Sequence, residues 1–161
     1  MAGPYWIDAG VLITAKNKQY GFDLVPGFWI FIETQLRSGV VRMPKIAFEE
    51  ITNGNDELAR WCKERRNVGY FCVRSGQREV QERYETIANH VVSVYKPHHA
   101  AKFLSGADGW IIAHALASHG YVVTDENRRY PSKVKIPIVA RAMGATWKSL
   151  FTMCNDLKAS F

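Results

Sequence analysis

Ser105 to Glu126 reads SGADGWIIAHALASHGYVVTDE, and this stretch decides the fold that the sequence predicts. After Asp108, apolar residues recur at the spacing of one helix face, namely Ile111, Ile112, Ala115 and Leu116. We expect the helix to stop at His119-Gly120, because glycine tolerates the left-handed conformation that ends many helices. The following residues 121–124 (YVVT) form a short apolar run, which is typical of a buried strand in a parallel sheet.

The remaining chain alternates between short apolar runs and longer amphipathic stretches. Strands are predicted at 5–7, 40–43, 121–124, 134–136 and 146–147, with a further candidate at 71–73. Helices are predicted from Pro26 to about 38, and at 45–52, 56–66, 75–95, 138–143 and 149–157. Residues 9–13 are expected to turn into a further helix, and Pro97-His98-His99 to end the long one. This alternation predicts an α/β fold, a three-layer α/β/α sandwich with a mostly parallel central sheet, as one domain over residues 1–161.

Charge and cysteine usage narrow the class of protein. A net charge of +6 and a pI near 9.3 favour a polyanionic partner, with nucleic acid the first candidate. No leader-like or membrane-spanning run is apparent, so we expect a cytoplasmic protein with no membrane association. The three cysteines, Cys62, Cys72 and Cys154, form no CxxC pair, which favours free thiols in a reducing compartment.

Carboxylates stand beside predicted strands or at helix ends in four places, at Asp8, Glu50, Asp108, and Asp125 with Glu126. In open α/β sheets, functional groups gather beyond the carboxyl ends of the strands, so acids far apart in sequence can meet there. Several carboxylates at one edge would repel one another, and a divalent cation would relieve that repulsion. A site built only of oxygen ligands selects Mg²⁺ or Mn²⁺ over zinc.

Four segments in order resemble the motifs of PIN-domain nucleases. Residues 5–13 (YWIDAGVLI) are similar to the opening strand and turn, and 48–54 (FEEITNG) to the second motif. Residues 107–115 (ADGWIIAHA) are similar to the third motif, an acid that opens an alanine-rich helix. Residues 122–126 (VVTDE) look like the fourth, an apolar strand followed by threonine and an acid. The resemblance spans nearly the whole chain, and 135–137 (KIP) also look like one bacterial subfamily of VapC-like toxins.

The resemblance implies a Mg²⁺- or Mn²⁺-dependent endoribonuclease, very often the toxin of a toxin–antitoxin pair. By position, Asp8, Glu50 and Asp108 match the metal-binding acids of the family. The fourth acid is open, because Asp125 directly follows Thr124 whereas Glu126 better fits the pattern of threonine, any residue, acid. The implied partners are RNA, a cognate antitoxin protein and a second copy of the chain.

Further side chains are candidates for metal binding or RNA contact. Glu49 and Glu50 are adjacent and point to different faces of one helix, so only one is expected at the site, and we favour Glu50. Arg128, Arg129 and Lys133 follow the fourth motif and are predicted to contact RNA phosphates. The pair His98-His99 lacks metal-ligand spacing, so a loop or phosphate-contact role is preferred over zinc.

Two rival functions remain open. Members of the family often carry Ser, Thr or Asn two residues after the first acid, and Gly10 cannot supply that side-chain oxygen. A catalytically degenerate RNA-binding or protein-interaction module is therefore the alternative. An aspartate-based phosphatase or phosphoreceiver on a similar sheet is the other rival. Such phosphatases generally need a second acid where Gly10 stands, and receivers an acidic pair that is absent near the first strand.

Overall fold

The fold is built around a short parallel sheet. The computed structural model describes residues 3–126 and 134–161. Four strands, β1 (Tyr5–Ile7), β2 (Val41–Arg42), β3 (Tyr121–Val123) and β4 (Thr146–Lys148), form a sheet in the order β2-β1-β3-β4. All three pairings are parallel, and β1 pairs with β3 from Tyr5 opposite Tyr121 to Ile7 opposite Val123. The predicted α/β class with a parallel sheet is confirmed.

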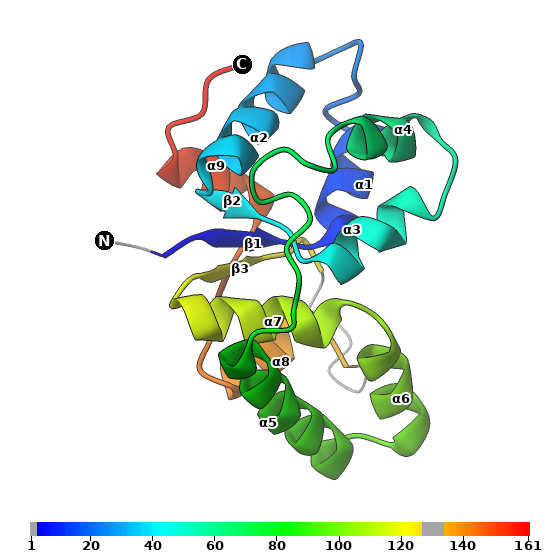
Figure 1. The fold of residues 1–161 in the computed structure, drawn as a ribbon, viewed down its shortest axis with the longest axis vertical. Helices are drawn as coiled ribbons and strands as arrows, with labels where there is room; N and C mark the ends of the chain where they lie inside the picture. Colours follow the sequence, from blue (N-terminus) through cyan, green and yellow to red (C-terminus); the bar gives the residue numbers. More distant parts are fainter. Residues whose placement is uncertain (1–2, 127–133) are drawn as a thin grey trace.

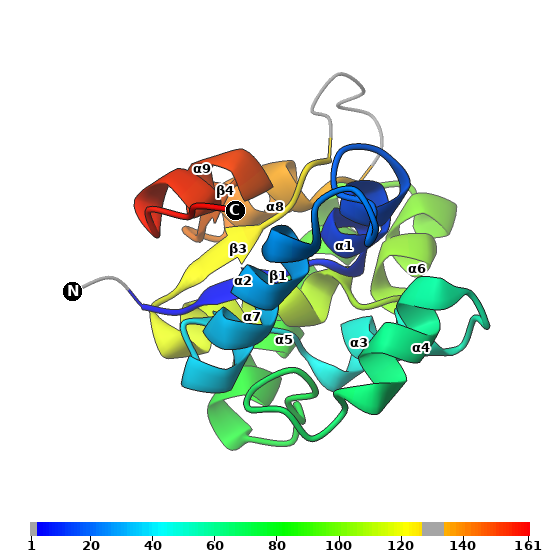
Figure 2. The same cartoon turned by 90° about the horizontal axis from the view of Figure 1, so that it is seen from above.

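Helices cover both faces of this sheet (Figure 1). They are α1 (Ala9–Asn17), α2 (Pro26–Ser38), α3 (Lys45–Thr52), α4 (Glu57–Glu64), α5 (Arg78–Val94), α6 (Pro97–Ser105), α7 (Asp108–Ser118), α8 (Ile136–Ala142) and α9 (Leu150–Asp156). One layer holds α1, α2, α4 and α9, and the opposite layer holds α5, α6, α7 and α8 (Figures 1 and 2). None of the helices in the described part of the chain has the length and apolar character needed to cross a membrane.

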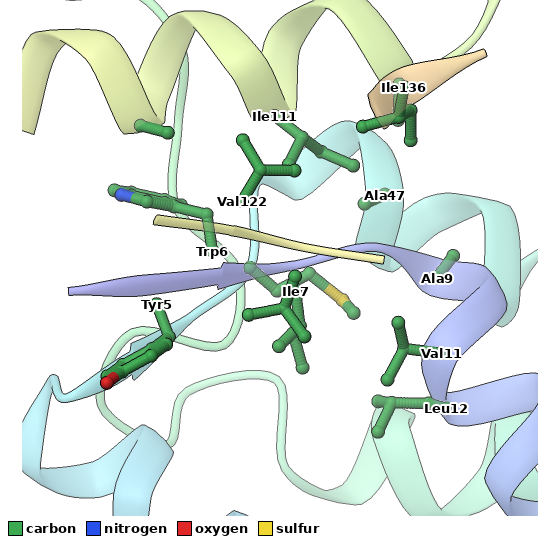
Figure 3. Close-up of a cluster of buried hydrophobic side chains, with 14 of the residues drawn as sticks. Tyr5, Trp6, Ile7, Ala9, Val11, Leu12, Ala47, Ile111, Val122 and Ile136 are labelled. Atoms are coloured by element: carbon green, nitrogen blue, oxygen red, sulfur yellow. The ribbon is translucent and has the colours of Figure 1, made fainter. Parts of the chain in front are cut away.

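The central strand β1 alternates its side chains between the two layers (Figure 3). Trp6 points toward α7, on the same side of the sheet as Val122 of β3 and Ile111 of α7. Tyr5 and Ile7 point to the opposite face, as the period of two along a strand requires. All five side chains are buried, so both faces of the sheet contribute to the core. This explains why the strand sequences are continuously apolar rather than alternating.

The turn from α7 into β3 depends on close backbone approach. His119, and not Gly120, adopts the left-handed conformation, with φ 55°, so the expectation that glycine takes it is wrong. Gly120 is needed for a different reason: a Cβ built there would lie 2.2 Å from the carbonyl oxygen of Pro4. The Tyr121 amide donates to that same carbonyl at 2.8 Å. This contact brings the start of β3 into register with β1.

Three predicted elements differ in the structure. Pro97 does not merely end the long helix; it opens a separate helix, α6, because proline suits a first helical turn. Residues 134–136 are not a strand, since Ile136 already begins α8. Ser75 does not cap α5, which begins at Arg78. The candidate at 71–73 amounts to one isolated bridge between Val73 and Pro44.

Ser75 instead pairs with a buried histidine. Its Oγ lies 2.8 Å from Nε2 of His114, whose ring stacks on Trp6 with centroids 4.4 Å apart. His114 is only 3% exposed, and this burial lowers the pKa of its imidazole to about 4. The neutral ring therefore joins the segment before α5 to the central strand, and His114 is a packed side chain of the core.

His114 is expected to make the fold acid-sensitive. The folded pKa of about 4 lies below the usual 6.5, so the unfolded chain binds more protons between these values. The stability that neutral His114 supports is complete above pH 6.5 and falls as the pH drops toward 4, by up to about 3 kcal/mol. In urea titrations across this range, His114→Phe should lack this loss, whereas His90→Phe on α5 should keep it. Equal slopes in the wild type and His114→Phe would contradict the assignment.

Candidate active site

Four carboxylates from four separate elements gather at the carboxyl edge of the sheet. Asp8 directly follows β1 and precedes α1, and Asp108 is the first residue of α7. Glu50 lies in α3, and Glu126 follows β3 by three residues. In Figure 1 this edge is where β1 ends and α7 begins, with α3 and α6 on the same side. The topology therefore brings together acids that lie more than a hundred residues apart in sequence.

Asp8 is the buried member of the group, with 7% of its surface exposed. The Gly10 backbone amide donates to its carboxylate, and Thr124 Oγ1 donates to Oδ2 at 3.5 Å. These bonds favour the ionised form, but burial opposes it more strongly. Burial, followed by the charges of Glu126 and then Glu50, raises the pKa of Asp8 to about 7. Two hydrogen bonds therefore fix the position of the Asp8 carboxylate, while its surroundings disfavour its ionised form.

The surroundings of Asp108 also disfavour its ionised form. Burial is the largest cause, and the neighbouring charges of Asp8, Glu126 and Glu50 add to it, raising the pKa of Asp108 to about 8. The ammonium of Lys135 acts in the other direction. The charges of Glu50 and Glu126 therefore act on both buried acids, Asp8 and Asp108, and make them harder to ionise.

Backbone amides orient the other two acids. Glu126 Oε2 accepts from the Ile136 amide at 2.8 Å, at the start of α8, and its own amide donates to Thr124 Oγ1 at 3.2 Å. Glu50 Oε2 accepts from the Ala107 amide at 3.3 Å, just before α7. Partial burial raises the pKa of Glu50 as well. Both carboxylates are therefore tied to the helices that frame the site.

The structure distinguishes the members of two pairs of adjacent acids, Asp125 and Glu126, and Glu49 and Glu50. Asp125 does not join the group: its Oδ1 accepts from the Leu150 amide at 3.1 Å, at the first turn of α9. Burial raises the pKa of Cys154, a half-buried thiol on α9, and the charge of Asp125 adds to it. Burial likewise raises the pKa of Cys72, and Glu49 adds to that shift, whereas Glu49 is not among the charges that act on Asp8 or Asp108. The geometry therefore places Glu126 and Glu50 with Asp8 and Asp108, and gives Asp125 a structural contact.

A pocket of about 580 Å³ opens at this edge. Its lining combines acids with basic and imidazole side chains from α6 and from the start of α8, namely Glu50, His98, His99, Lys102, Phe103, Ser105, Gly106, Asp108, Glu126, Val134 and Lys135. Asp8 lies behind this surface. The sequence patterns did not identify Lys102 or Lys135 as site residues. His98 and Lys102 are four residues apart, a spacing that places them on one face of α6 once that helix is recognised. The predicted RNA-binding residues Arg128, Arg129 and Lys133 lie outside the described residues.

The side chains fit a hard divalent cation by chemistry. Within residues 3–126 and 134–161, no three His, Cys, Asp or Glu side chains converge closely enough to hold a metal ion as they stand. The donors at the edge are all carboxylate oxygens, which suit Mg²⁺ or Mn²⁺ and not zinc. Burial, and after it the neighbouring carboxylate charges, raises the pKa values of Asp8 and Asp108, so positive charge at this edge would favour their ionised forms. A cation would supply that charge and draw the carboxylates together.

Removing one charge from the group is expected to stabilise the metal-free protein. The pKa of Asp108 is raised from 3.8 to about 8, so ionising it costs folding free energy as the pH rises through this window. Asp108→Asn should therefore raise the unfolding free energy at pH 8 in EDTA by at least about 1 kcal/mol, or roughly 2–4 °C in Tm. The gain should vanish near pH 4. Asp125→Asn is the matched control and should give no gain; a pH-independent effect of Asp108→Asn would contradict this account.

Solved structures share this architecture at low sequence identity. VapBC2 from Rickettsia felis, determined with a DNA fragment from its promoter, is 11% identical, with 90% of this chain and 97% of that chain covered and a TM-score of 0.53. VapBC-1 from nontypeable Haemophilus influenzae is 13% identical, with coverage of 90% and 96% and a TM-score of 0.53. FitAcB from Neisseria gonorrhoeae is 16% identical, with coverage of 89% and 95% and a TM-score of 0.50. These likenesses support the PIN-like fold.

Comparison by sequence gives a family without an assigned activity. No curated protein matches the chain. A family model described as a domain of unknown function, DUF4411, matches residues 5–161, which is nearly the full chain. The protein therefore belongs to the DUF4411 family, and its fold is PIN-like.

Proposed function

We propose that this protein is a Mg²⁺- or Mn²⁺-dependent endoribonuclease that hydrolyses RNA phosphodiesters. One observation carries the proposal: Asp8, Glu50, Asp108 and Glu126 are electrostatically coupled at the carboxyl edge of a PIN-like sheet. Perturbed acids that share a pocket are a common signature of functional sites. The net charge of +6 around this acidic edge also suits an enzyme that attracts a polyanion.

Asp8, Glu50, Asp108 and Glu126 would hold the ion, and Glu126 takes the fourth position in preference to Asp125. When bound, a divalent ion of this kind lowers the pKa of a water molecule and stabilises charge on a phosphoryl oxygen. The chain's own contribution is orientation. The Gly10 amide and the Thr124 hydroxyl fix Asp8, and the Ile136 amide fixes Glu126. The Ala107 amide does the same for Glu50.

Gly10 keeps the alternative of a non-catalytic module open. A Cβ built at Gly10 would lie 3.3 Å from Asp8 Oδ2, so a side chain at this position would reach the first acid directly. The hydroxyl or amide that many PIN-domain proteins carry there is absent. The Thr124 hydroxyl contacts the same oxygen of Asp8 from β3, at 3.5 Å, and offers a substitute. This substitution is why we favour the enzyme over the degenerate RNA-binding module.

The proposal includes a toxin role with a protein partner. The similar structures include two VapBC proteins, which are toxin–antitoxin complexes, and an antitoxin here would be expected to cover the acidic pocket. Expression of the wild type should then arrest bacterial growth, while Asp108→Asn should not. Co-expression of the product of a neighbouring reading frame should relieve the arrest. Normal growth with soluble, folded wild type present would argue against the toxin role.

RNA cleavage by the purified protein tests the enzymatic proposal. Cutting is expected with Mn²⁺ and with Mg²⁺, and none with EDTA. Asp108→Asn and Glu50→Gln should each lower the rate by about 10³-fold or more, because each removes a charged ligand of the ion that stabilises the transition state. Glu49→Gln is the matched control on the same helix and should retain activity within about twofold.

Two results would overturn the proposal. Cleavage that persists in EDTA would remove the metal from the mechanism. RNA binding without cleavage under every metal condition, by protein shown to be folded, would favour the binding module.

A further inference from the structure

The acidic pocket has a second, basic wall that the proposed metal ligands do not explain. Helix α6 contributes His98, Lys102 and Ser105 to the lining, at spacings of four and three residues, which form one face of a helix. Lys135, the residue that precedes α8, also belongs to the lining. The wall therefore draws on two elements that the sequence separates by about thirty residues.

The two ammonium groups are not used to hold the fold together. Within the described part of the chain, neither Lys102 nor Lys135 forms an ion pair within 4.0 Å of a carboxylate. Lys148, by contrast, pairs directly with Asp156. The side chain of Lys135 does not cap α8 either. The Lys135 charge acts on Asp108 across the pocket without a direct ion pair, so both ammonium groups can contact a ligand there.

The positive charges of Lys102 and Lys135 would offset the repulsion between the acids of the pocket and a bound phosphate. A phosphodiester carries a negative charge, and Glu50, Asp108 and Glu126 on the same lining would repel it. A sphere of the pocket's volume, about 580 Å³, is roughly 10 Å across, which is about one Debye length at 0.1 M ionic strength. The acidic and basic side chains of this lining therefore act on the same bound group without being fully screened.

We propose that Lys102 and Lys135 bind a backbone phosphate of the RNA substrate inside the acidic pocket. This inference rests on the proposed ribonuclease function and names positioning residues for it. The lysines hold the chain so that a neighbouring phosphodiester reaches the carboxylates. They act on binding and alignment, while the acids act on the reacting atoms.

The test compares Lys102→Gln, Lys135→Gln and the double variant with Lys96→Gln. Lys96 lies at the N-cap of α6, is exposed, and is not part of the pocket lining, so it controls for the loss of one positive charge near the site. Affinity for a labelled single-stranded oligoribonucleotide is measured in the Asp108→Asn background between about 50 and 200 mM salt. Steady-state cleavage is measured in the otherwise wild-type protein, with Tm as the check on folding.

Each pocket lysine should contribute one phosphate contact. Losing one should reduce the slope of log affinity against log salt by about 0.7, and losing both by about 1.4. KM should rise roughly three- to tenfold for each substitution, with kcat within about twofold, because binding and not chemistry is weakened. Lys96→Gln should leave both the slope and KM unchanged. A lysine that only supported the fold would lower Tm without changing the salt slope.

The outcomes separate this inference from the proposed function. Cleavage by the wild type with unchanged slope and KM in the double variant overturns the phosphate contact and leaves the nuclease standing. A reduced salt slope in the double variant, without cleavage by the wild type, supports the phosphate contact and counts against the nuclease. An equal loss of affinity in Lys96→Gln would also overturn the inference, because it would show a general effect of charge.

Discussion

Carboxylates buried beside other carboxylates are the constraint on which the rest of the site depends. Burial is the main cause that raises the pKa of Asp8 and of Asp108, and the neighbouring charges of Glu50 and Glu126 add to it. A fold does not keep such a group for stability, since neutral side chains at the same positions would repel less. The arrangement stores free energy that a divalent cation can release on binding. Under the proposed function, the carboxylate oxygens would hold that cation, and Lys102 and Lys135 in the same lining would add positive charge for the substrate.

The surrounding structure is a frame that holds these acids in place. The strands are only two or three residues long, so the sheet has few ladder hydrogen bonds, and its position depends on the core on both faces. Trp6 and Ile7 enter opposite layers directly before Asp8, which fixes where the chain leaves the sheet (Figure 3). Backbone amides of Gly10, Ala107 and Ile136 then orient three of the acids. Packing sets the position of the acids, and helix-start amides set their direction.

The sequence predicted the features that depend on local patterns. The apolar runs located all four strands of the sheet, and glycine and proline marked the bounds of α2 and α3 to within a residue or two. Features that depend on contacts distant in sequence were not accessible. The role of Ser75 is set by His114, 39 residues away, and a capping position was the natural local interpretation. Likewise, adjacent acids look equivalent in sequence, and only the Leu150 amide reveals that Asp125 turns toward α9.

Helix α6 shows the same limit in a way that matters for function. Pro97 can end one helix or begin the next, and the pattern of 97–105 is too short to decide between them. Once the helix is recognised, its spacing places His98 and Lys102 on one face, toward the acids. The phosphate-contact role expected for the adjacent histidines stays a prediction, and we propose the same role for Lys102 and Lys135.

Calorimetric titration of Mn²⁺ into the wild type, Glu126→Gln and Asp125→Asn tests the central claim most directly. The two substitutions remove one charge each from neighbouring residues, but only Glu126 belongs to the coupled group. The account predicts equal affinity in the wild type and Asp125→Asn, and a loss of more than about tenfold in Glu126→Gln. No measurable binding to the folded wild type, or a greater loss in Asp125→Asn than in Glu126→Gln, would contradict it.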